Sequence, residues 1–489
     1  MRPYYSLLDE PWLTAVTLTG EHTSCGIRQV LQQAHTMRAL TDASPLVEYG
    51  LYRLLCVLLM DALRPQELED LEELLDKGQF DAKTLEQYYT RCEQEGCTFD
   101  LFDPERPFLQ ASYRPEWDKA PKPVCVLDVT IPSGNNHTHF DHRENEKISF
   151  SYAQAARLLP AVQMFCTAAA QGYPSGPNGA PPYYALVQGD NLFETLVLSM
   201  IDMDTVRGQF DRPPILWRST IEIEPKRVVP ETSWLYGMLF PARRVLLLPD
   251  EQTQTVSRVY FSQGMNYIAT QNWTDPHVTY RFSDKGRFAW RPNQERPVWR
   301  NLNTLLKDDK KSRPRTLEQF TALRPGKRYV SVVLYGVQTE QASYIDVMRY
   351  DLKIPTAALQ HPDAAALVET CIKLSEDLAS VLRASLTHED LPPAVASEAE
   401  QAYYDDCERR IWQICGGIPA DTNADLQPFL LAWIEDIAQF ARQQYTKAIG
   451  QILLRGTSLL AVTQRQGLLM AKIHKIRKEH GLCGNSKNN

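Results

Sequence analysis

The 489-residue sequence is poor in the features that mark secreted and membrane proteins. Its N-terminus has no apolar stretch before a small-residue cleavage site, so we predict no secretory signal. No segment approaches 18 uninterrupted apolar residues, and the best one, residues 51–63, is interrupted by Arg53 and Asp61. These absences exclude a protein with membrane-spanning helices and favour a cytoplasmic one.

Cysteine is present without a pattern. The ten cysteines are scattered, and no two of them form a CxxC pair. In a long intracellular chain such thiols are mostly small core residues, so we expect no disulfide framework. Cys92 and Cys97 are the only near pair, and with no second pair beside them a zinc site is not expected.

Catalytic and nucleotide-binding signatures are also missing. The sequence contains neither GxxxxGK[ST] nor GxGxxG, which excludes the common phosphate-cradling loops. It has no Ser/His/Asp order, no nucleophile elbow and no paired-carboxylate motif. We therefore predict a protein that is not an enzyme and that carries no cofactor or metal.

Charge is nearly balanced overall but uneven along the chain. The net charge is −8, from 52 Lys and Arg against 60 Asp and Glu, which excludes a generally basic coat. Residues 281–328 nevertheless hold fourteen basic and five acidic residues, a local charge of +9. Aromatic residues interleave with these cations, as expected for contact with phosphates and unpaired bases. Equally, the arginines could simply cover Trp290 and Trp299.

The pattern of apolar residues changes near residue 356. Before it, β-like runs such as 244–248 and 332–335 mix with helices and most of the 32 prolines, which predicts an irregular mixed α/β domain over residues 1–356. After it, the sequence is almost wholly helical. We predict helices over 364–386, 397–417, 426–449 and 458–480, the second one starting at a Ser397/Glu400 capping box. The predicted fold class is α+β, with a four-helix bundle over residues 357–489.

A loop at 132–143 concentrates metal-binding residue types. His137, His139, Asp141 and His142 lie within six residues, and imidazole and carboxylate are the usual donors to zinc or iron. No helix orients these side chains and no distant partner motif accompanies them, which counts against a metal site. A metal-dependent nuclease built on this loop is kept as the alternative function. The same residues also suit a surface turn or a contact with nucleic acid.

Two other polar segments have an ordinary and a functional interpretation. Glycines within residues 171–182 allow the backbone to approach a nucleic acid closely, or they form an ordinary tight loop. Residues 335–343 follow the apolar run 330–334, and their glutamines carry both a donor and an acceptor for base edges. By itself this segment is equally a hairpin turn.

Together these segments resemble the CasA family, the large subunits of the type I-E CRISPR surveillance complex called Cascade. The resemblance covers the whole chain in the family's order, and it rests on segments 99–110, 133–136, 140–142, 188–195, 235–244 and 335–343 and on the terminal bundle. The resemblance implies that the protein inspects duplex DNA for a short protospacer-adjacent motif, the PAM. It also implies that the protein opens the duplex there so that a guide RNA can pair, a division of labour known from another RNA-guided effector.

The resemblance also implies roles for individual residues that contact DNA. Gln341, flanked by Glu340 and Ala342, falls on the wedge that splits the base pair beside the PAM. Gly172 falls on the glycine loop, which is thin here because residues 168–171 are AAAQ. The family's lysine finger has no match, since residues 247–258 contain no Lys, and Arg258 or Gln254 is left as its substitute.

The remaining implications concern partners. The loop that contacts the 5′ handle of the guide RNA (crRNA) maps onto residues 135–143, with the contacts falling on Asn135, Asn136, Phe140, Asp141 and His142. The terminal bundle would face the displaced strand and help recruit the helicase-nuclease, and the basic stretch 472–478 fits that role. Other Cascade subunits and double-stranded target DNA complete the expected partners. A purely structural subunit that clasps the RNA handle and never touches duplex DNA is a further hypothesis.

Overall fold

The computed structural model divides the chain into two compact units, each built from several segments. The first unit comprises residues 1–294, 314–326 and 330–353, and the second comprises residues 295–313, 327–329 and 354–489. The structure describes residues 3–131, 148–168, 172–203, 215–268, 273–284, 286–293, 296–307, 312–340, 343–387, 393–453 and 459–482.

Helix α2 (Pro45–Leu63) lies at the centre of the first unit. It is apolar on every side and is buried almost throughout, which is how a core helix differs from an amphipathic surface helix. Pro45 occupies the first turn, where a missing N–H costs nothing. Helix α5 (Tyr152–Met164) packs against α2, and a Cβ on Gly50 would lie 3.0 Å from the backbone nitrogen of Ala161. The two helices can approach this closely because Gly50 has no side chain.

Small sheets surround this core. One antiparallel sheet has the order β2-β1-β3, another has the order β14-β13-β6, and a third joins β4, β5 and β8 to the central strand β9. Strands β7 and β10 form a parallel pair, and β11 and β12 form an antiparallel ribbon. The bounds are β1 Leu13–Thr17, β2 His22–Cys25, β3 Met37–Leu40, β4 Lys122–Pro123, β5 Phe150–Ser151, β6 Tyr184–Gln188, β7 Val228–Val229, β8 Arg243–Asp250, β9 Thr255–Gln263, β10 Asn266–Tyr267, β11 Tyr280–Ser283, β12 Gly286–Ala289, β13 Tyr329–Glu340 and β14 Ser343–Pro355.

Shorter helices close the remaining faces of the first unit. Several begin at side-chain caps, as where Asp81 accepts a hydrogen bond from the Thr84 N–H and Asn191 from the Glu194 N–H. Their bounds are α1 Ile27–Gln32, α3 Leu68–Lys77, α4 Ala82–Gln94, α6 Leu192–Leu198, α7 Trp234–Met238 and α9 Arg315–Leu323. The short 3₁₀ helices are η1 Ala34–Thr36, η2 Val124–Leu127, η6 Leu216–Arg218 and, in the second unit, η7 Val298–Asn301.

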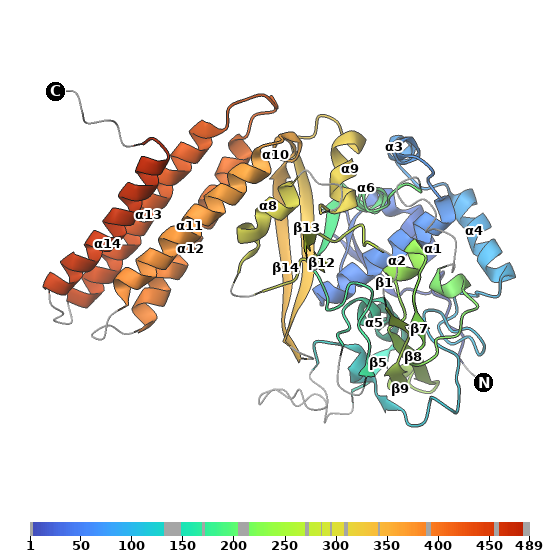
Figure 1. Cartoon of the computed structure of the whole chain (residues 1–489). Helices are drawn as coiled ribbons and strands as arrows, with labels where there is room; N and C mark the ends of the chain where they lie inside the picture. Colours follow the sequence, from blue (N-terminus) through green and yellow to red (C-terminus); the bar gives the residue numbers. More distant parts are fainter. Residues whose placement is uncertain are drawn as a thin grey trace. The chain divides into compact units, whose positions relative to one another are not determined.

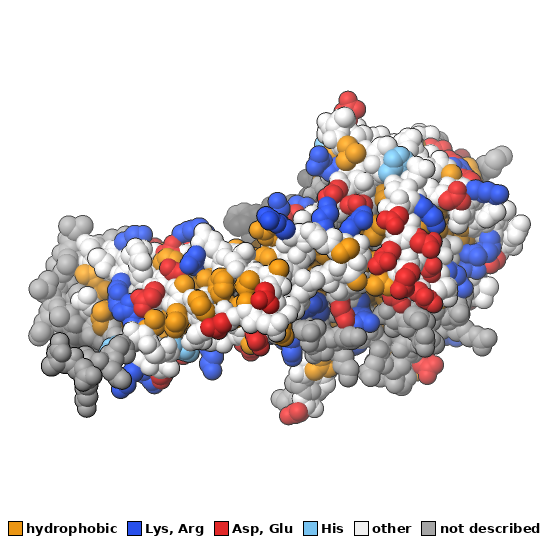
Figure 2. All heavy atoms as spheres, turned by 90° about the horizontal axis from the view of Figure 1, so that it is seen from above, with side chains coloured by type: hydrophobic (Ala, Val, Ile, Leu, Met, Phe, Trp, Pro, Cys, Tyr) orange, Lys and Arg blue, Asp and Glu red, His pale blue; other side chains and the backbone are white. Residues whose placement is uncertain are grey.

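The second unit is a helical bundle (Figure 1). Helix α11 (Ala364–Leu386) contacts α12 (Pro393–Gly417), α13 (Gln427–Leu453) and α14 (Leu459–Glu479), and the short helices α8 (Leu302–Leu306) and α10 (Thr356–Gln360) also contact it. On the face seen in Figure 2, hydrophobic side chains gather over the helices of this unit, with Lys, Arg, Asp and Glu side chains scattered among them. The α+β class and the terminal helical bundle predicted from sequence are confirmed.

One predicted helix start is wrong. Helix α12 begins at Pro393, four residues before the predicted Ser397. Ser397 therefore lies inside the first turns, where its hydroxyl donates to the carbonyl of Pro393 at 3.4 Å, and it is not the first residue of a capping box. A proline in the first turn is compatible with a helix because the N–H there has no intrahelical partner.

The described residues include nine of the ten cysteines of the chain. The nine cysteines among them are buried free thiols, in agreement with their predicted place in the core. No helix in the described part of the chain is both long and apolar enough to cross a membrane.

Candidate nucleic-acid interface

Gly172 occupies a tight turn that only a glycine fits without strain. Its φ is +79°, in the left-handed region that side-chain-bearing residues rarely adopt. A Cβ at this position would lie 3.3 Å from Cε and 3.6 Å from Nζ of Lys226, and 3.6 Å from the Gln263 amide nitrogen. The turn therefore brings bare backbone directly beside a lysine side chain.

Lys226 is a residue that the sequence analysis did not single out. Its side chain is exposed, and among the described residues no ion pair holds it. Its backbone has φ +63° and its N–H donates to the carbonyl of Gly264 at 2.9 Å, which places the side chain at the glycine turn. The nearby Glu222 carboxylate is bonded to Arg114 at 2.5 Å instead. Nothing in the sequence around Lys226 distinguishes it from other surface lysines, since its neighbour Gly172 lies 54 residues earlier.

Tyr173, the next residue along the turn, belongs to a cluster of rings and cations. It stacks on Phe261 of β9, with ring centroids 6.3 Å apart and an angle of 23° between the planes. Lys122 of β4 donates to the Tyr173 hydroxyl at 2.9 Å, and its ammonium lies 5.5 Å from both ring centroids. These contacts hold the glycine turn against the four-stranded sheet.

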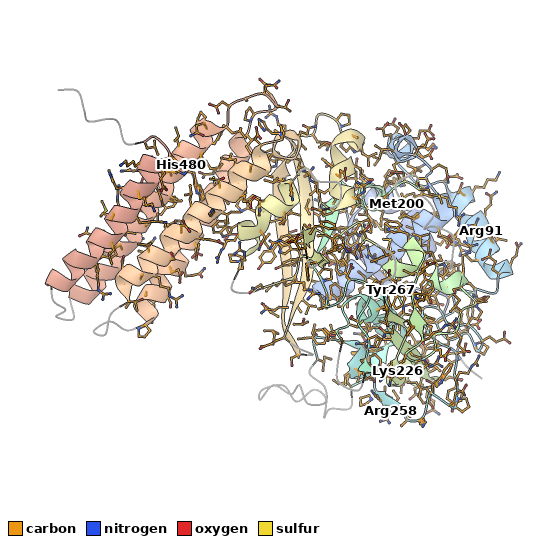
Figure 3. All side chains as sticks on the ribbon, viewed as in Figure 1. Arg91, Met200, Lys226, Arg258, Tyr267 and His480 are labelled. Atoms are coloured by element: carbon orange, nitrogen blue, oxygen red, sulfur yellow. The ribbon has the colours of Figure 1, made fainter. Side chains whose placement is uncertain are left out.

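Arg258, the predicted substitute for the lysine finger, lies on the same sheet but on its other face. Alternate residues of a strand point to opposite faces, so Arg258 of β9 points away from Phe261 and Gln263. Its guanidinium is exposed and donates to the carbonyl of Pro121 at 2.7 Å. Lys226 and Arg258 lie at the end of the first unit where β5, β8 and β9 meet (Figure 3). Gln254 is exposed in the β8–β9 turn, with φ +52°.

The strand pair β13–β14 is longer than the sequence indicated. Residues 335–340, interpreted as a strand end or a turn, continue β13 as regular strand up to the exposed Glu340. The predicted wedge residues Gln341 and Ala342 lie outside the described residues. Just beyond them, the Tyr344 hydroxyl donates to the carbonyl of Phe165 at 3.1 Å. Phe165 follows α5 and lies seven residues before Gly172, so the hairpin and the glycine turn share one anchoring point.

A buried polar network supports the other end of the 171–182 segment. Arg53 of α2 forms a two-pronged ion pair with Asp275, and both side chains are almost fully buried. Asn178 donates to the same carboxylate at 3.2 Å and accepts from the Tyr280 hydroxyl at 2.6 Å. Asn178 thus links the segment to a charged pair inside the core. The segment is therefore not a loose surface loop, although its sequence is rich in glycine.

His277 completes this network in its neutral form. Its Nε2 lies 2.8 Å from the carbonyl of Ser199, which requires a proton on Nε2. Its Nδ1 therefore accepts hydrogen bonds, from the Tyr49 hydroxyl at 2.6 Å and from Arg53 at 3.2 Å. Burial, reinforced by the Arg53 charge, lowers the pKa of His277 to about 4. Burial opposes ionisation of Asp275, but the Arg53 charge and hydrogen bonds, together with His277 and its backbone N–H, hold the pKa of that carboxyl below its ordinary value.

The basic segment 281–328 divides into two parts. Trp299 is fully buried, Arg296 and Arg300 both pair with Glu376 at 2.9 Å, and Arg313 donates to backbone carbonyls. These arginines serve the packing of the second unit, as the structural interpretation expected. Its other part, the β11–β12 ribbon, exposes Phe282 and Phe288, each at 49%, opposite Arg287 and Arg281 respectively. This ribbon keeps the exposed aromatic and cationic composition that suits unpaired bases.

The basic stretch of the last helix is largely ion-paired. Lys472 lies 3.1 Å from Asp377, Lys475 lies 3.8 Å from Glu479, and Arg477 pairs with Glu435. These contacts neutralise much of the positive charge that the sequence suggested for a strand-tracking surface.

The predicted handle loop cannot be placed. Asn135, Asn136, Phe140, Asp141 and His142 lie outside the described residues, as do His137 and His139 of the alternative metal site. Within the described ranges, no group of three or more His, Cys, Asp or Glu side chains is arranged to hold a metal ion.

The chain thus forms two compact units, one mixed and one helical, and an exposed lysine lies beside a glycine turn in the first. The model of the family described as CRISPR-associated protein Cse1 matches residues 6–454. The chain is also 31% identical, over 402 residues, to the CRISPR-associated protein CasA/Cse1 of Thermus thermophilus, and the match covers 78% of this chain and 76% of that protein. This chain belongs to the CasA/Cse1 family, which confirms the resemblance found in its sequence.

Solved structures share the fold over nearly the whole chain. The crystal structure of Thermus thermophilus CasA superposes with a TM-score of 0.77 at 24% identity, covering 97% of this chain and all of that one. Cse1 from Acidimicrobium ferrooxidans gives a TM-score of 0.78 at 20% identity, covering 98% and 99%. A chain of a structure described as a CRISPR RNA-guided surveillance complex gives 0.72 at 20% identity, covering 92% and all of that chain.

Proposed function

We propose that this chain is the PAM-recognising, duplex-opening large subunit of a type I-E Cascade complex, acting in the cytoplasm in antiviral defence and catalysing no reaction itself. Membership of the CasA/Cse1 family supports this proposal, as does the likeness to a chain from an RNA-guided surveillance complex. The observation that carries it is the shared anchoring of the glycine turn and the β13–β14 hairpin through Tyr344 and Phe165.

PAM reading falls to the glycine turn and the lysine beside it. At Gly172 the backbone is bare, so it can enter a minor groove that a side chain would obstruct. Lys226 is exposed and unpaired among the described residues, so it can reach a phosphate or a base-edge acceptor next to the turn. Lys226 therefore takes the role for which the 247–258 segment offered only Arg258 or Gln254. Minor-groove readout is degenerate, which predicts a tolerant PAM preference.

Opening the duplex falls to the hairpin tip, where Gln341 acts as the wedge between Glu340 and Ala342. Unstacking one base step costs about a few kcal/mol, so a wedge on a mobile loop would bend away before the bases part. Strands of 12 and 13 residues lead into and out of this tip, and Tyr344 ties its return strand to the end of α5. Such a support is stiff enough for the task.

The remaining contacts are with RNA and protein. Asn135, Asn136, Phe140, Asp141 and His142 contact the 5′ handle of the guide RNA (crRNA), which docks the chain on the other Cascade subunits. The helical unit faces the displaced strand and helps recruit the helicase-nuclease.

The test uses the assembled complex with its guide RNA. Gln341→Ala should weaken R-loop formation on linear duplex DNA while co-purification with guide RNA and partner subunits is unchanged. Gln94→Ala, at an exposed glutamine in the last turn of α4, is the matched control and should behave like the parent. Unchanged R-loop formation by Gln341→Ala would overturn the wedge assignment.

Two further measurements separate the competing functions. A subunit that only clasps the RNA handle would bind PAM-bearing and PAM-scrambled duplexes equally at every salt concentration. If the chain were a metal-dependent nuclease, the purified protein would cleave DNA and would lose that activity in EDTA. The proposed function predicts PAM-dependent binding and no EDTA-sensitive cleavage.

A further inference from the structure

Arg243, the first residue of β8, is buried without a carboxylate partner among the described residues. Only 5% of its surface is exposed. Its guanidinium donates to three backbone carbonyls, those of Thr167 at 2.6 Å, Pro174 at 2.5 Å and Ala242 at 3.0 Å. A buried arginine is usually paired with an acid. Because Arg243 donates to neutral backbone carbonyls instead, we infer that it has a specific structural role.

The positions of the carbonyls that Arg243 binds indicate this role. Thr167 and Pro174 lie on either side of Gly172, so a single guanidinium holds both ends of the glycine turn. The planar fork of an arginine presents several donors in fixed directions, which a lysine cannot do. The guanidinium carbon also lies 5.0 Å from the ring centroid of Tyr173, against whose face it packs.

The backbone of Arg243 is itself held in place. Its N–H donates to the Gln163 side-chain oxygen at 2.9 Å, and the Gln163 amide donates back to the Arg243 carbonyl at 2.8 Å. Gln163 is buried in the last turn of α5, two residues before Phe165. The clamp on the glycine turn is therefore continuous with the end of α5.

The hairpin reaches the same place from the other side. Tyr344 of β14 donates to the carbonyl of Phe165 at 3.1 Å. Burial raises the pKa of the Tyr344 hydroxyl, while the nearby Arg243 charge and hydrogen bonds donated by Thr167 act in the opposite direction. Tyr344 thus adjoins both Phe165 and the Thr167 end of the clamp.

We propose that Arg243 is a positioning residue that, together with Tyr344, makes the glycine turn and the start of β14 a single rigid support. In this arrangement a contact made by the turn fixes where the hairpin tip enters the duplex. The proposal rests on the proposed function, because it assigns the coupling between PAM contact and duplex opening to these two side chains.

Arg243→Lys in the assembled complex is the first test. A lysine keeps the charge but cannot hold Thr167 and Pro174 in a fixed geometry, so the ratio of affinities for PAM-bearing and PAM-scrambled duplexes should fall about tenfold. Binding to a target that already carries an unpaired bubble beside the PAM should be unchanged, since no opening is required there. Arg383→Lys, at an exposed arginine of the helical unit, is the control.

Tyr344→Phe is the second and milder variant. It keeps the proposal testable if Arg243→Lys does not fold. It removes one hydroxyl and keeps the ring, so the ratio should fall about threefold to fivefold, as expected for one net hydrogen bond. Tyr329→Phe, whose side chain is 50% exposed, should change nothing. Thermal melting of every variant verifies that the first unit is folded.

The outcomes are distinguishable. If the parent complex bound PAM-bearing and PAM-scrambled duplexes equally well, the proposed function itself would be wrong. A parent that discriminates, together with folded Arg243→Lys and Tyr344→Phe variants that discriminate equally well, would overturn only the present inference. An equal loss on closed and bubble targets would also overturn it, because it would show a general binding defect without a defect in coupling.

Discussion

Lysine and arginine have different surroundings near the glycine turn of the first unit and in the helical unit. Around Gly172, Arg243 is buried on carbonyls and Lys226 is exposed with no ion pair among the described residues. In the helical unit, Lys472 and Arg477 pair with acids of neighbouring helices. Positive charge in a sequence therefore indicates a nucleic-acid surface only where the fold leaves it without a carboxylate.

The two regions also differ in what a broken contact costs. An exposed ion pair is worth about 0–1 kcal/mol because water screens it. A buried pair such as Arg53–Asp275 leaves an uncompensated charge when one partner is removed, which typically costs about 3–5 kcal/mol. Mutations in the two regions should thus separate by stability as well as by DNA binding.

The largest effect is expected at the buried Arg53–Asp275 pair. Asp275→Ala should lower the free energy of unfolding of the first unit by about 3–5 kcal/mol, because Arg53 and Asn178 both lose their partner. Hydrogen exchange of α2 amides in increasing urea measures this unit separately. A change below about 1 kcal/mol, the range of surface pairs, would remove the contrast between the two regions.

Acid should destabilise the first unit before the helical one. His277 is neutral when folded, with a pKa of about 4 against 6.5 in the unfolded chain. Below about pH 6.5 the unfolded state therefore binds more protons, and stability falls by at most about 1.4 kcal/mol per pH unit until about pH 4. The depressed pKa of Asp275 adds a loss at still lower pH. Urea denaturation at several pH values measures this slope, and His277→Gln should flatten it; an equal slope in that variant would contradict the assignment.

A smaller effect is expected at the glycine turn itself. Gly172→Ala forces an L side chain to a φ of +79° beside Lys226, a strain of about 1–2 kcal/mol per residue. Affinity for PAM-bearing duplex should fall by about tenfold or more, because the turn must relax to relieve the strain. Gly326→Ala, at an equally positive φ of +84° with open space around its Cβ position, is the matched control and should leave DNA affinity unchanged.

The smallest effect compares two lysines directly. Lys226→Ala should reduce the slope of log affinity against log salt by about one, the value for one lost phosphate contact. Lys472→Ala, which removes a cation already paired with Asp377, should leave that slope unchanged. Equal slopes for both variants would mean that pairing with an acid does not decide which cations meet DNA.

Sequence patterns identified the helices well, because a helix depends on neighbouring residues. The apolar stripe of residues 364–386 predicted the bounds of α11 without error. The start of α12 was predicted at Ser397 because the Ser397/Glu400 spacing is typical of a capping box. The helix begins about one turn earlier because Pro393 is compatible with the first turn of a helix. The polar residues 335–340 were ambiguous because pairing with β14, rather than local preference, carries β13 on to Glu340, past Tyr335 where the pairing with β6 ends.

The candidate site depended on distance in sequence. The family resemblance pointed to Gly172 but not to Lys226, since only folding brings the two together. The arginines of 281–328 could not be sorted either, because Glu376 and the carbonyls that bind them lie on other elements.

The sequence by itself determined the family, the α+β class and the terminal helices, because motif order and apolar periodicity are properties of the chain read locally. Only the tertiary structure decided which cations face solvent and which are neutralised, and that Arg243 joins the glycine turn to the hairpin. Burial and pairing involve residues far apart along the chain, so those choices exist only once the chain has folded.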